Sequence, residues 1–138
     1  MIDANLSGGD EIIRRLGALY FDSQKMQKFS RMAGAEMVHQ TEERFYNQHD
    51  LGRSPWIPSQ RAIADQGKTL RDTGRLMASL TYIALPDGVK WGTNVSYAKA
   101  MHYGLPERNV TARPFMGMND DDRASVLNII NRIMDVDL

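Results

Sequence analysis

The chemical groups best placed to hold a metal ion lie within one helical stretch of the chain. His39, Glu42 and Glu43 are three and four residues apart, so an imidazole and a carboxylate can share one helix face. Two ligands do not complete a metal site, and no spacing predicts that His49 or His102 supplies the third. A solvated polar face with charge pairs between successive turns is the simpler interpretation. The sequence therefore predicts no bound metal.

Three consecutive acids, Asp120, Asp121 and Asp122, form a second group of carboxylates. The ligands of a calcium loop alternate along the sequence around a glycine, and these acids lack that arrangement. Capping of a helix and stabilisation of its dipole explain them better. Elsewhere no nucleophile elbow surrounds a serine, and no glycine loop with a following lysine could hold a phosphate. We expect no catalytic residue, no cofactor and no enzymatic activity.

The composition indicates one soluble domain spanning residues 1–138. A hydrophobic content of 42% in a chain of this length is enough for one core. Cysteine is absent, which excludes disulfides and thiolate metal sites and fits a reducing cytoplasm. No apolar run approaches the roughly 20 residues of a membrane-spanning helix, and the N-terminus lacks the pattern of a signal peptide. We therefore expect no membrane association.

Charge gives little overall reason to expect nucleic acid as a partner. Seventeen basic residues balance seventeen acidic ones, so direct sequence-specific DNA binding is not expected. A locally basic zone nevertheless surrounds Trp56 and could follow a phosphate backbone, although Asp65 and Asp72 dilute it. The basic residues of this zone are Arg53, Arg61, Lys68, Arg71 and Arg75.

Helical periodicity is strongest from Ser23 to about Gln48, which predicts one long helix with Gly34 as the point where it would break. The residues expected on its buried side are Met26, Phe29, Ala33, Met37 and Phe45. The residues expected on its solvated side are Lys25, Lys28, Arg31, Glu36, Glu42, Glu43 and Arg44. The methionines at this spacing indicate core filling more than a docking surface.

Weaker patterns flank this helix on both sides. An alternating segment at residues 2–6 predicts a strand closed by a turn at residues 8–9, and Asp10 could cap a helix carrying Ile12, Ile13, Leu16, Leu19 and Tyr20. The apolar runs on either side of the turn at residues 86–88 predict a hairpin with strands near 79–85 and 88–92. A third strand is expected near 110–112. Before the hairpin, Asp72 or Thr73 could cap a short helix.

The C-terminal part completes the predicted fold. Asn119 or Asp120 is expected to cap a final helix, and its predicted inward residues are Val126, Leu127, Ile130, Ile133 and Met134. The fold class is therefore α+β, with a small antiparallel sheet packed against a long helix and additional N- and C-terminal helices.

The segment at about 49–68 reads as an irregular loop because two prolines and two glycines interrupt its pattern. Trp56 is its large anchor, and we expect it to pin the loop onto the body. The alternative is an exposed ring that inserts into a partner.

Three sequence motifs occur in order in the second half of the chain. They are L-x-x-T-G-x-L-x-x-S-L at 70–80, G-T-N-x-x-Y-A at 92–98 and A-R-P-F-x-G at 112–117. Together with Trp56 and the final amphipathic helix, this series resembles the phage virion morphogenesis family, which includes tail completion proteins of Mu-like tailed phages. The resemblance covers roughly residues 10–135. One departure is at Met101, where the family often has histidine. In this chain the histidine falls one position later, at His102, which favours a packing role for this motif.

The resemblance implies a non-enzymatic structural protein that acts in tail completion or head–tail joining. It implies a homo-oligomeric ring, with a hexamer as the expected form, at the neck of the virion after assembly in the cytoplasm of the bacterial host. The implied partners are further copies of the chain and the tail tube and head connector proteins. The alternative function is a DNA-contacting neck or regulatory module that uses the basic zone from Arg53 to Arg75.

The motifs also suggest physical roles for particular residues. Gly74 would permit close approach of a helix to the sheet, and Gly92 with Asn94 would suit a turn that leaves the β region. Arg113 precedes Pro114 and is held extended, so its guanidinium could pair with a carboxylate of a neighbouring subunit or of the same chain. The candidate interface residues are Trp56, Arg71, Arg75, Tyr97, Tyr103, Arg113 and Phe115.

Overall fold

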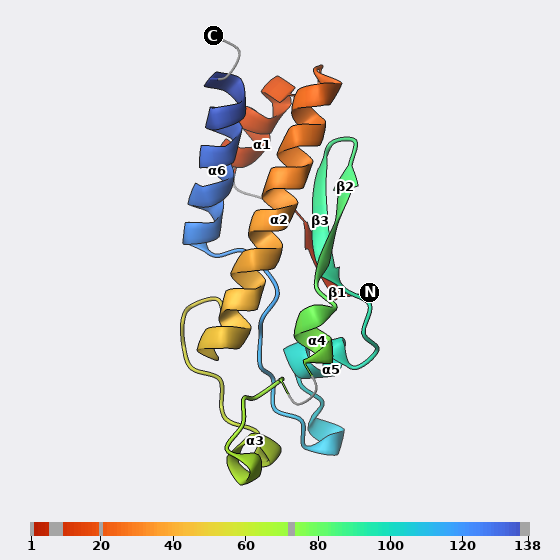
Figure 1. The fold of residues 1–138 in the computed structure, drawn as a ribbon, viewed down its shortest axis with the longest axis vertical. Coiled ribbons are helices and arrows are strands. Elements are labelled where there is room, and N and C mark those ends of the chain that lie inside the picture. The colour runs from red at the N-terminus through yellow and green to blue at the C-terminus, as the bar shows by residue number, and fades with distance from the viewer. Residues whose placement is uncertain (1, 6–9, 20, 72–73, 136–138) are drawn as a thin grey trace.

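The long helix α2 (Ser23–Asn47) is the central element of the fold (Figure 1). The computed structural model describes residues 2–5, 10–19, 21–71 and 74–135. A small sheet packs on one side of α2 and the helix α6 (Asp120–Asp135) packs on another, with the helix α1 (Asp10–Leu16) against α6 (Figure 1). This arrangement confirms the predicted α+β class with its N- and C-terminal helices.

The boundaries of α2 follow from its capping residues. The Asp22 carboxylate accepts hydrogen bonds from the backbone of Gln24 and Lys25, each at 3.1 Å, and Gln48 ends the helix in the left-handed conformation. The residues predicted for its inner face are all buried, namely Met26, Phe29, Ala33, Met37 and Phe45. The predicted break at Gly34 is wrong, because α2 runs through that residue.

Gly34 instead provides room for an aromatic ring of the sheet. A Cβ atom at this position would lie 2.4 Å from Cδ2 of Tyr82. Tyr82 pairs across the sheet with Trp91, which is fully buried and whose indole Nε1 has no hydrogen-bond partner within the described residues. The glycine therefore sets how closely the helix and the sheet approach each other.

The sheet has three antiparallel strands in the order β1–β3–β2. The hairpin strands β2 (Thr81–Leu85) and β3 (Gly88–Thr93) confirm the prediction, as does the N-terminal strand β1 (Ile2–Asn5). The strand predicted near 110–112 is wrong, since Val110 forms only an isolated bridge with Leu105. Gly92 is also not a turn residue, because it pairs within β3 with Asp3 and Thr81.

The final helix begins with a reciprocal pair of side-chain caps. The side-chain Oδ1 of Asn119 accepts from the Asp122 backbone N–H at 2.8 Å, and the Asp122 carboxylate accepts from the Asn119 backbone N–H at 3.0 Å, which confirms Asn119 as the cap. The inward face carries Val126, Ile129, Ile130 and Ile133, which are buried, and the partly buried Leu127. The inward placement of Met134 is wrong, because its exposed fraction is 40%.

The N-terminal helix is short and continues into the 3₁₀ helix η1 (Gly17–Leu19). Ile12, Leu16 and Leu19 are buried as predicted. The structure does not describe the turn at residues 8–9, Tyr20 or the side chains of Asp10 and Ile13, so those predictions lie outside the described residues.

Around and below the end of α2 the chain forms a region of mostly irregular backbone, which we call the lower region, residues 48–71, 74–79 and 94–119 (Figure 1). It holds the short helices α3 (Gln60–Asp65), α4 (Arg75–Ala78), α5 (Ala98–Tyr103) and η2 (Pro106–Arg108). The predicted irregular loop therefore contains one helix, α3. The second motif, at 92–98, runs from the end of β3 to the first residue of α5.

The role predicted for Gly74 is wrong. It precedes α4 with φ +76°, and apart from its chain neighbours no atom of the described residues lies within 4 Å of where its Cβ would stand, so it serves the backbone conformation and not a close approach. The capping predicted for Asp72 or Thr73 lies outside the described residues.

Candidate functional site

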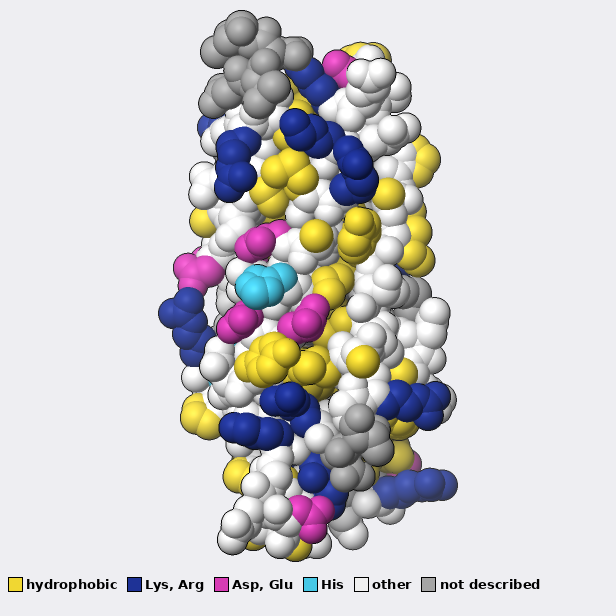
Figure 2. Space-filling model, in the orientation of Figure 1, with side chains coloured by type: hydrophobic (Ala, Val, Ile, Leu, Met, Phe, Trp, Pro, Cys, Tyr) yellow, Lys and Arg dark blue, Asp and Glu magenta, His cyan; other side chains and the backbone are white. Residues whose placement is uncertain are grey.

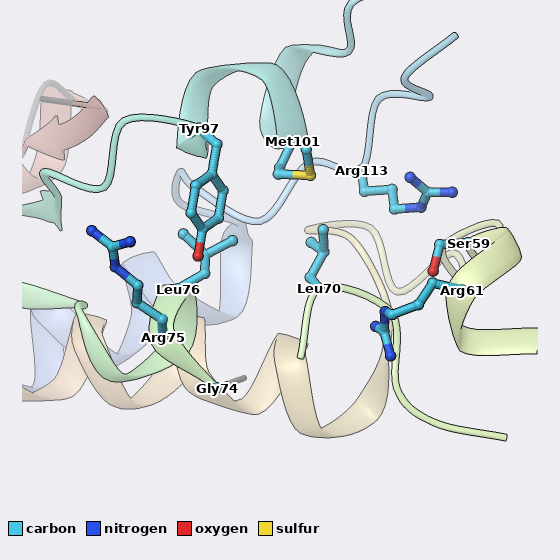
Figure 3. A pocket seen from close by; sticks show the side chains of 9 residues that line it. All are labelled: Ser59, Arg61, Leu70, Gly74, Arg75, Leu76, Tyr97, Met101 and Arg113. Carbon is cyan, nitrogen blue, oxygen red and sulfur yellow. The ribbon is translucent and has the colours of Figure 1, made fainter. Parts of the chain in front are cut away.

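The three sequence motifs converge on one groove in the lower region, which we call the motif groove (Figure 3). It measures about 510 Å³ and is lined by Ser59, Arg61, Leu70, Gly74, Arg75, Leu76, Tyr97, Met101 and Arg113. Leu70 to Leu76 belong to the first motif, Tyr97 to the second and Arg113 to the third. Segments that are far apart in the sequence thus form one surface feature.

Trp56 holds the loop that forms one wall of the groove. Its exposed fraction is 6%, its indole Nε1 donates to the Pro114 carbonyl at 2.9 Å, and its ring packs edge-on against Phe45 at 5.5 Å. The prediction that Trp56 pins the loop is confirmed, and the alternative of an exposed inserting ring is wrong.

The same loop is tied to the end of α2 by one side chain. The Gln48 amide donates to the Thr69 carbonyl at 2.9 Å and accepts from the Thr69 backbone at 2.7 Å. This double hydrogen bond fixes the chain just before Leu70, which contributes to the floor of the groove.

Arg113 is largely buried and is held by backbone carbonyls. Its Nε donates to the Ile57 carbonyl at 2.7 Å, and its Nη1 lies 3.4 Å from the Thr111 carbonyl. Burial lowers the pKa of its guanidinium. No carboxylate among the described residues pairs with Arg113, so the intrachain carboxylate considered from the sequence is replaced by these carbonyls.

His102 joins α5 to the third motif. Its Nδ1 lies 3.2 Å from the Phe115 backbone nitrogen and 3.3 Å from that of Met116, and its ring packs edge-on against the Phe115 ring at 5.2 Å. Both backbone N–H groups donate, so Nδ1 must carry no proton. Burial lowers the pKa of His102, which favours the neutral form. The packing role expected for His102 therefore comes with a hydrogen-bonding role.

Arg44 links the long helix, the third motif and the final helix. Its Nη1 donates to the Phe115 carbonyl at 2.9 Å, and its Nη2 lies 2.5 Å from the Asp122 carboxylate, with both side chains buried. The prediction of Arg44 on the solvated side is wrong. The sequence offers no signal for this pair, because 78 residues separate its members.

The candidate interface residues divide into surface and core. Arg75, Tyr97 and Arg113 line the motif groove, whereas Trp56 and Phe115 lie in the core beneath it. Tyr103 is 68% exposed and lines a second hollow, beside η2. Arg71 stacks over the Tyr46 ring at 4.9 Å, outside the groove lining. Figure 3 shows Arg75 beside Tyr97 at one end of the groove and Arg113 near Arg61 at the other.

Two arginines of the basic zone have acidic neighbours. Arg53 pairs with Asp121, and Arg61 lies 4.0 Å from Asp65. In Figure 2 the lysines and arginines of the visible face form separate groups, with acidic and apolar side chains between them. This distribution differs from the single basic stripe that tracks a nucleic-acid backbone.

The groups considered for metal binding are used in local contacts. His39 lies 3.7 Å from Glu43, one helical turn away on α2. Across the described residues, no three histidine or acidic side chains gather as metal ligands. In the same part of the chain, no helix combines the length and apolar character required to cross a bilayer.

The fold and the groove define a small α+β protein whose distinctive site is an open, arginine-bearing surface groove. The family model described as "Phage virion morphogenesis family" matches residues 8–135, so the chain belongs to that family. This confirms the resemblance in the three motifs and indicates a role in phage assembly. Comparison with curated proteins and with solved structures gave no match.

Proposed function

We propose that this protein is a non-enzymatic assembly component that acts in tail completion or head–tail joining. It works as a homo-oligomeric ring, with six subunits as the expected number, at the neck of the virion. Its partners are further copies of itself and the tail tube and head connector proteins. Family membership over residues 8–135 supports the assembly role.

The observation that carries this proposal is the convergence of the three motifs on one surface groove. Motif residues that served only folding would be expected in the core, as Phe115 is. Arg75 and Tyr97 are instead exposed. The guanidinium carbon of Arg75 lies over the Tyr97 ring, 6.0 Å from the ring centre. An exposed arginine and tyrosine over an apolar floor are typical of contact surfaces between proteins.

The test is complementation of a phage that lacks this protein. We expect the variant Arg75→Ala/Tyr97→Ala to fold but to leave unjoined heads and tails, counted by electron microscopy. The matched control is Arg31→Ala, which removes an exposed arginine from α2 far along the helix from the groove. Normal phage yield from the double variant would count against the groove as an assembly surface.

A second measurement addresses the ring. Light scattering across concentrations should give a mass near six times that of the 15.6-kDa chain. A monomer at every concentration would exclude a ring that forms before its partners arrive.

The DNA-contacting alternative has less support, because Arg53 and Arg61 already have acidic neighbours. Salt-dependent retention on duplex DNA would favour this alternative, and no retention at low salt would remove it.

A further inference from the structure

The motif groove has two positive ends and an apolar middle. Arg75 lies at one end beside Tyr97, and Arg61 and Arg113 lie at the other end beside Ser59 (Figure 3). Leu70, Leu76 and Met101 lie between them. A complementary occupant is therefore an extended segment that carries two carboxylates and alternating apolar side chains.

The chain contains one short segment with this composition, at residues 134–138. Its sequence is Met-Asp-Val-Asp-Leu, in which Asp135 and Asp137 alternate with Val136 and Leu138. In an extended conformation the two carboxylates point to one side and the two apolar side chains to the other. The segment therefore supplies both kinds of group that the groove lining calls for, carboxylates for the arginines and apolar side chains for the floor. Met134 and Asp135 belong to α6, so an extended bound conformation requires the last residues of this helix to unwind.

A molecule cannot place this segment in its own groove. The helix α6 ends at Asp135 at one end of the molecule, while α4 and α5 lie at the level of the other end of α2 (Figure 1). The 25 residues of α2 span about 37 Å. The three residues after Asp135 reach at most about 11 Å.

We propose that the motif groove binds residues 134–138 of a second copy of this chain. The contact is head-to-tail, because the groove and the end of α6 lie toward opposite ends of each molecule. Such a contact joins two different surfaces, and it generates a ring when the rotation between copies closes. This inference rests on the proposed homo-oligomer and names the surfaces that would join its subunits.

The groove arginines already have contacts within the chain, and the proposed occupant would add to these contacts or exchange with them. Arg61 lies at the outer limit of an ion pair with Asp65 and donates to the Lys68 carbonyl at 2.6 Å. Arg113 uses Nε and Nη1 for carbonyls, which hold the guanidinium at the groove wall. Arg75 lies over the Tyr97 ring. A carboxylate can therefore meet positive charge already held in place, which reduces the loss of side-chain freedom on binding.

The first test uses a labelled peptide of residues 131–138 with an amidated end, so that Asp135 and Asp137 are its only acids. We expect it to bind the full-length protein in fluorescence anisotropy, and we expect Arg75→Gln to weaken binding about tenfold. Arg31→Gln is the control of equal charge change. A peptide of the same residues in scrambled order, and one with both acids changed to asparagine, should bind more weakly.

Absence of peptide binding, equal binding to wild type and Arg75→Gln, or equal binding of the scrambled peptide would overturn the proposal. The groove would then be left for an acidic segment of another protein. Arg75 is exposed, begins α4 and is not part of the hydrophobic core, so its substitution tests binding without opening a cavity.

The second test exchanges the charges. Arg75→Glu and Asp137→Lys should each lower the oligomer mass in light scattering, and the double variant should restore it. Equal mass in all variants of an oligomeric protein would exclude this contact while leaving the proposed ring intact. Failure of the proposed assembly role would instead appear as normal phage yield in the complementation experiment, and this result does not depend on peptide binding.

Discussion

Two regions of this molecule are held together in different ways. Around α2, α6 and the sheet, regular elements bury apolar side chains such as Phe29, Val89 and Ile130 against one another. In the lower region, side chains from distant parts of the chain bond to the backbone. Gln48, Trp56, His102 and Arg113 each reach a backbone group outside their own element.

In the lower region, hydrogen bonds from side chains allow a mostly irregular backbone to present a defined surface. A loop cannot satisfy its own buried carbonyl and N–H groups as a helix does, so side chains must supply the partners. The groove is formed by the segments that these bonds position. The shape of the groove therefore depends on single polar side chains. The shape of the region around α2, α6 and the sheet, which we call the upper region, depends instead on the packing of many apolar side chains.

The largest expected effect concerns the buried ion pair between Arg44 of α2 and Asp122 of α6, whose arginine also donates to the Phe115 carbonyl of the lower region. Asp122→Ala would leave Arg44 buried without its carboxylate and would remove half of the cap of α6, so we expect a loss of about 3–5 kcal/mol of stability. Urea unfolding measures this change. The double variant Arg44→Met/Asp122→Leu should be less destabilised than Asp122→Ala, because it removes both charges. A loss of stability below about 1 kcal/mol for Asp122→Ala would contradict the prediction that the buried ion pair is important for stability.

The next effect belongs to the upper region and tests packing. Gly34→Ala would place a methyl group 2.4 Å from the Tyr82 ring, and we expect a loss of about 1–3 kcal/mol. Thermal unfolding measures it. In a Tyr82→Ala background the same substitution should cost little, since the clash is gone. An equal cost in both backgrounds would show that the ring does not set the distance between helix and sheet.

A pair of tryptophans compares the two regions directly. Trp56→Phe breaks the hydrogen bond to Pro114 in the lower region, whereas Trp91→Phe in the sheet removes an indole without a partner among the described residues. We expect Trp56→Phe to cost about 1–2 kcal/mol more than Trp91→Phe after correction for lost volume. Denaturant midpoints of the two variants provide the comparison. A smaller loss for Trp56→Phe would mean that ring packing, and not the bond, holds the loop.

The smallest expected effect is a pH dependence from His102. Its folded pKa lies below the ordinary value of 6.5, so its contribution to stability is present above that value and is lost as the pH falls through the folded pKa. Protonation would place an N–H against the N–H groups of Phe115 and Met116. Unfolding measured from pH 7.5 down to pH 5 should therefore show declining stability. His102→Asn keeps an acceptor at the same place, so its pH dependence should be weaker; an unchanged dependence would point to other groups.

The sequence predicted the upper region well because apolar periodicity determines it. The spacing of Met26, Phe29, Ala33 and Met37 was enough to place the long helix and its buried face. The Asp-Gly turn likewise located the hairpin. These are local signals, which act within one element.

The lower region could be predicted only in part. The motifs identified the family and named Arg75, Tyr97 and Arg113, but no pattern indicated that these three residues share a groove. Arg44 was misplaced because a charged residue on a helix usually faces water, and its partner Asp122 lies on another helix. Side-chain bonds to a distant backbone leave no period in the sequence, so this region required the structure.

The hydrogen bonds of Gln48 also couple the motion of the end of α2 to the motion of the groove wall. This residue ends α2 and also holds Thr69 through two hydrogen bonds, and its own carbonyl accepts from the Trp56 backbone at 2.8 Å. Fraying of the last turn of the helix would therefore release the groove wall in the same step. The amide protons of Trp56 and Thr69 should then exchange with solvent together, as one cooperative opening unit, while those in the middle of α2 remain protected.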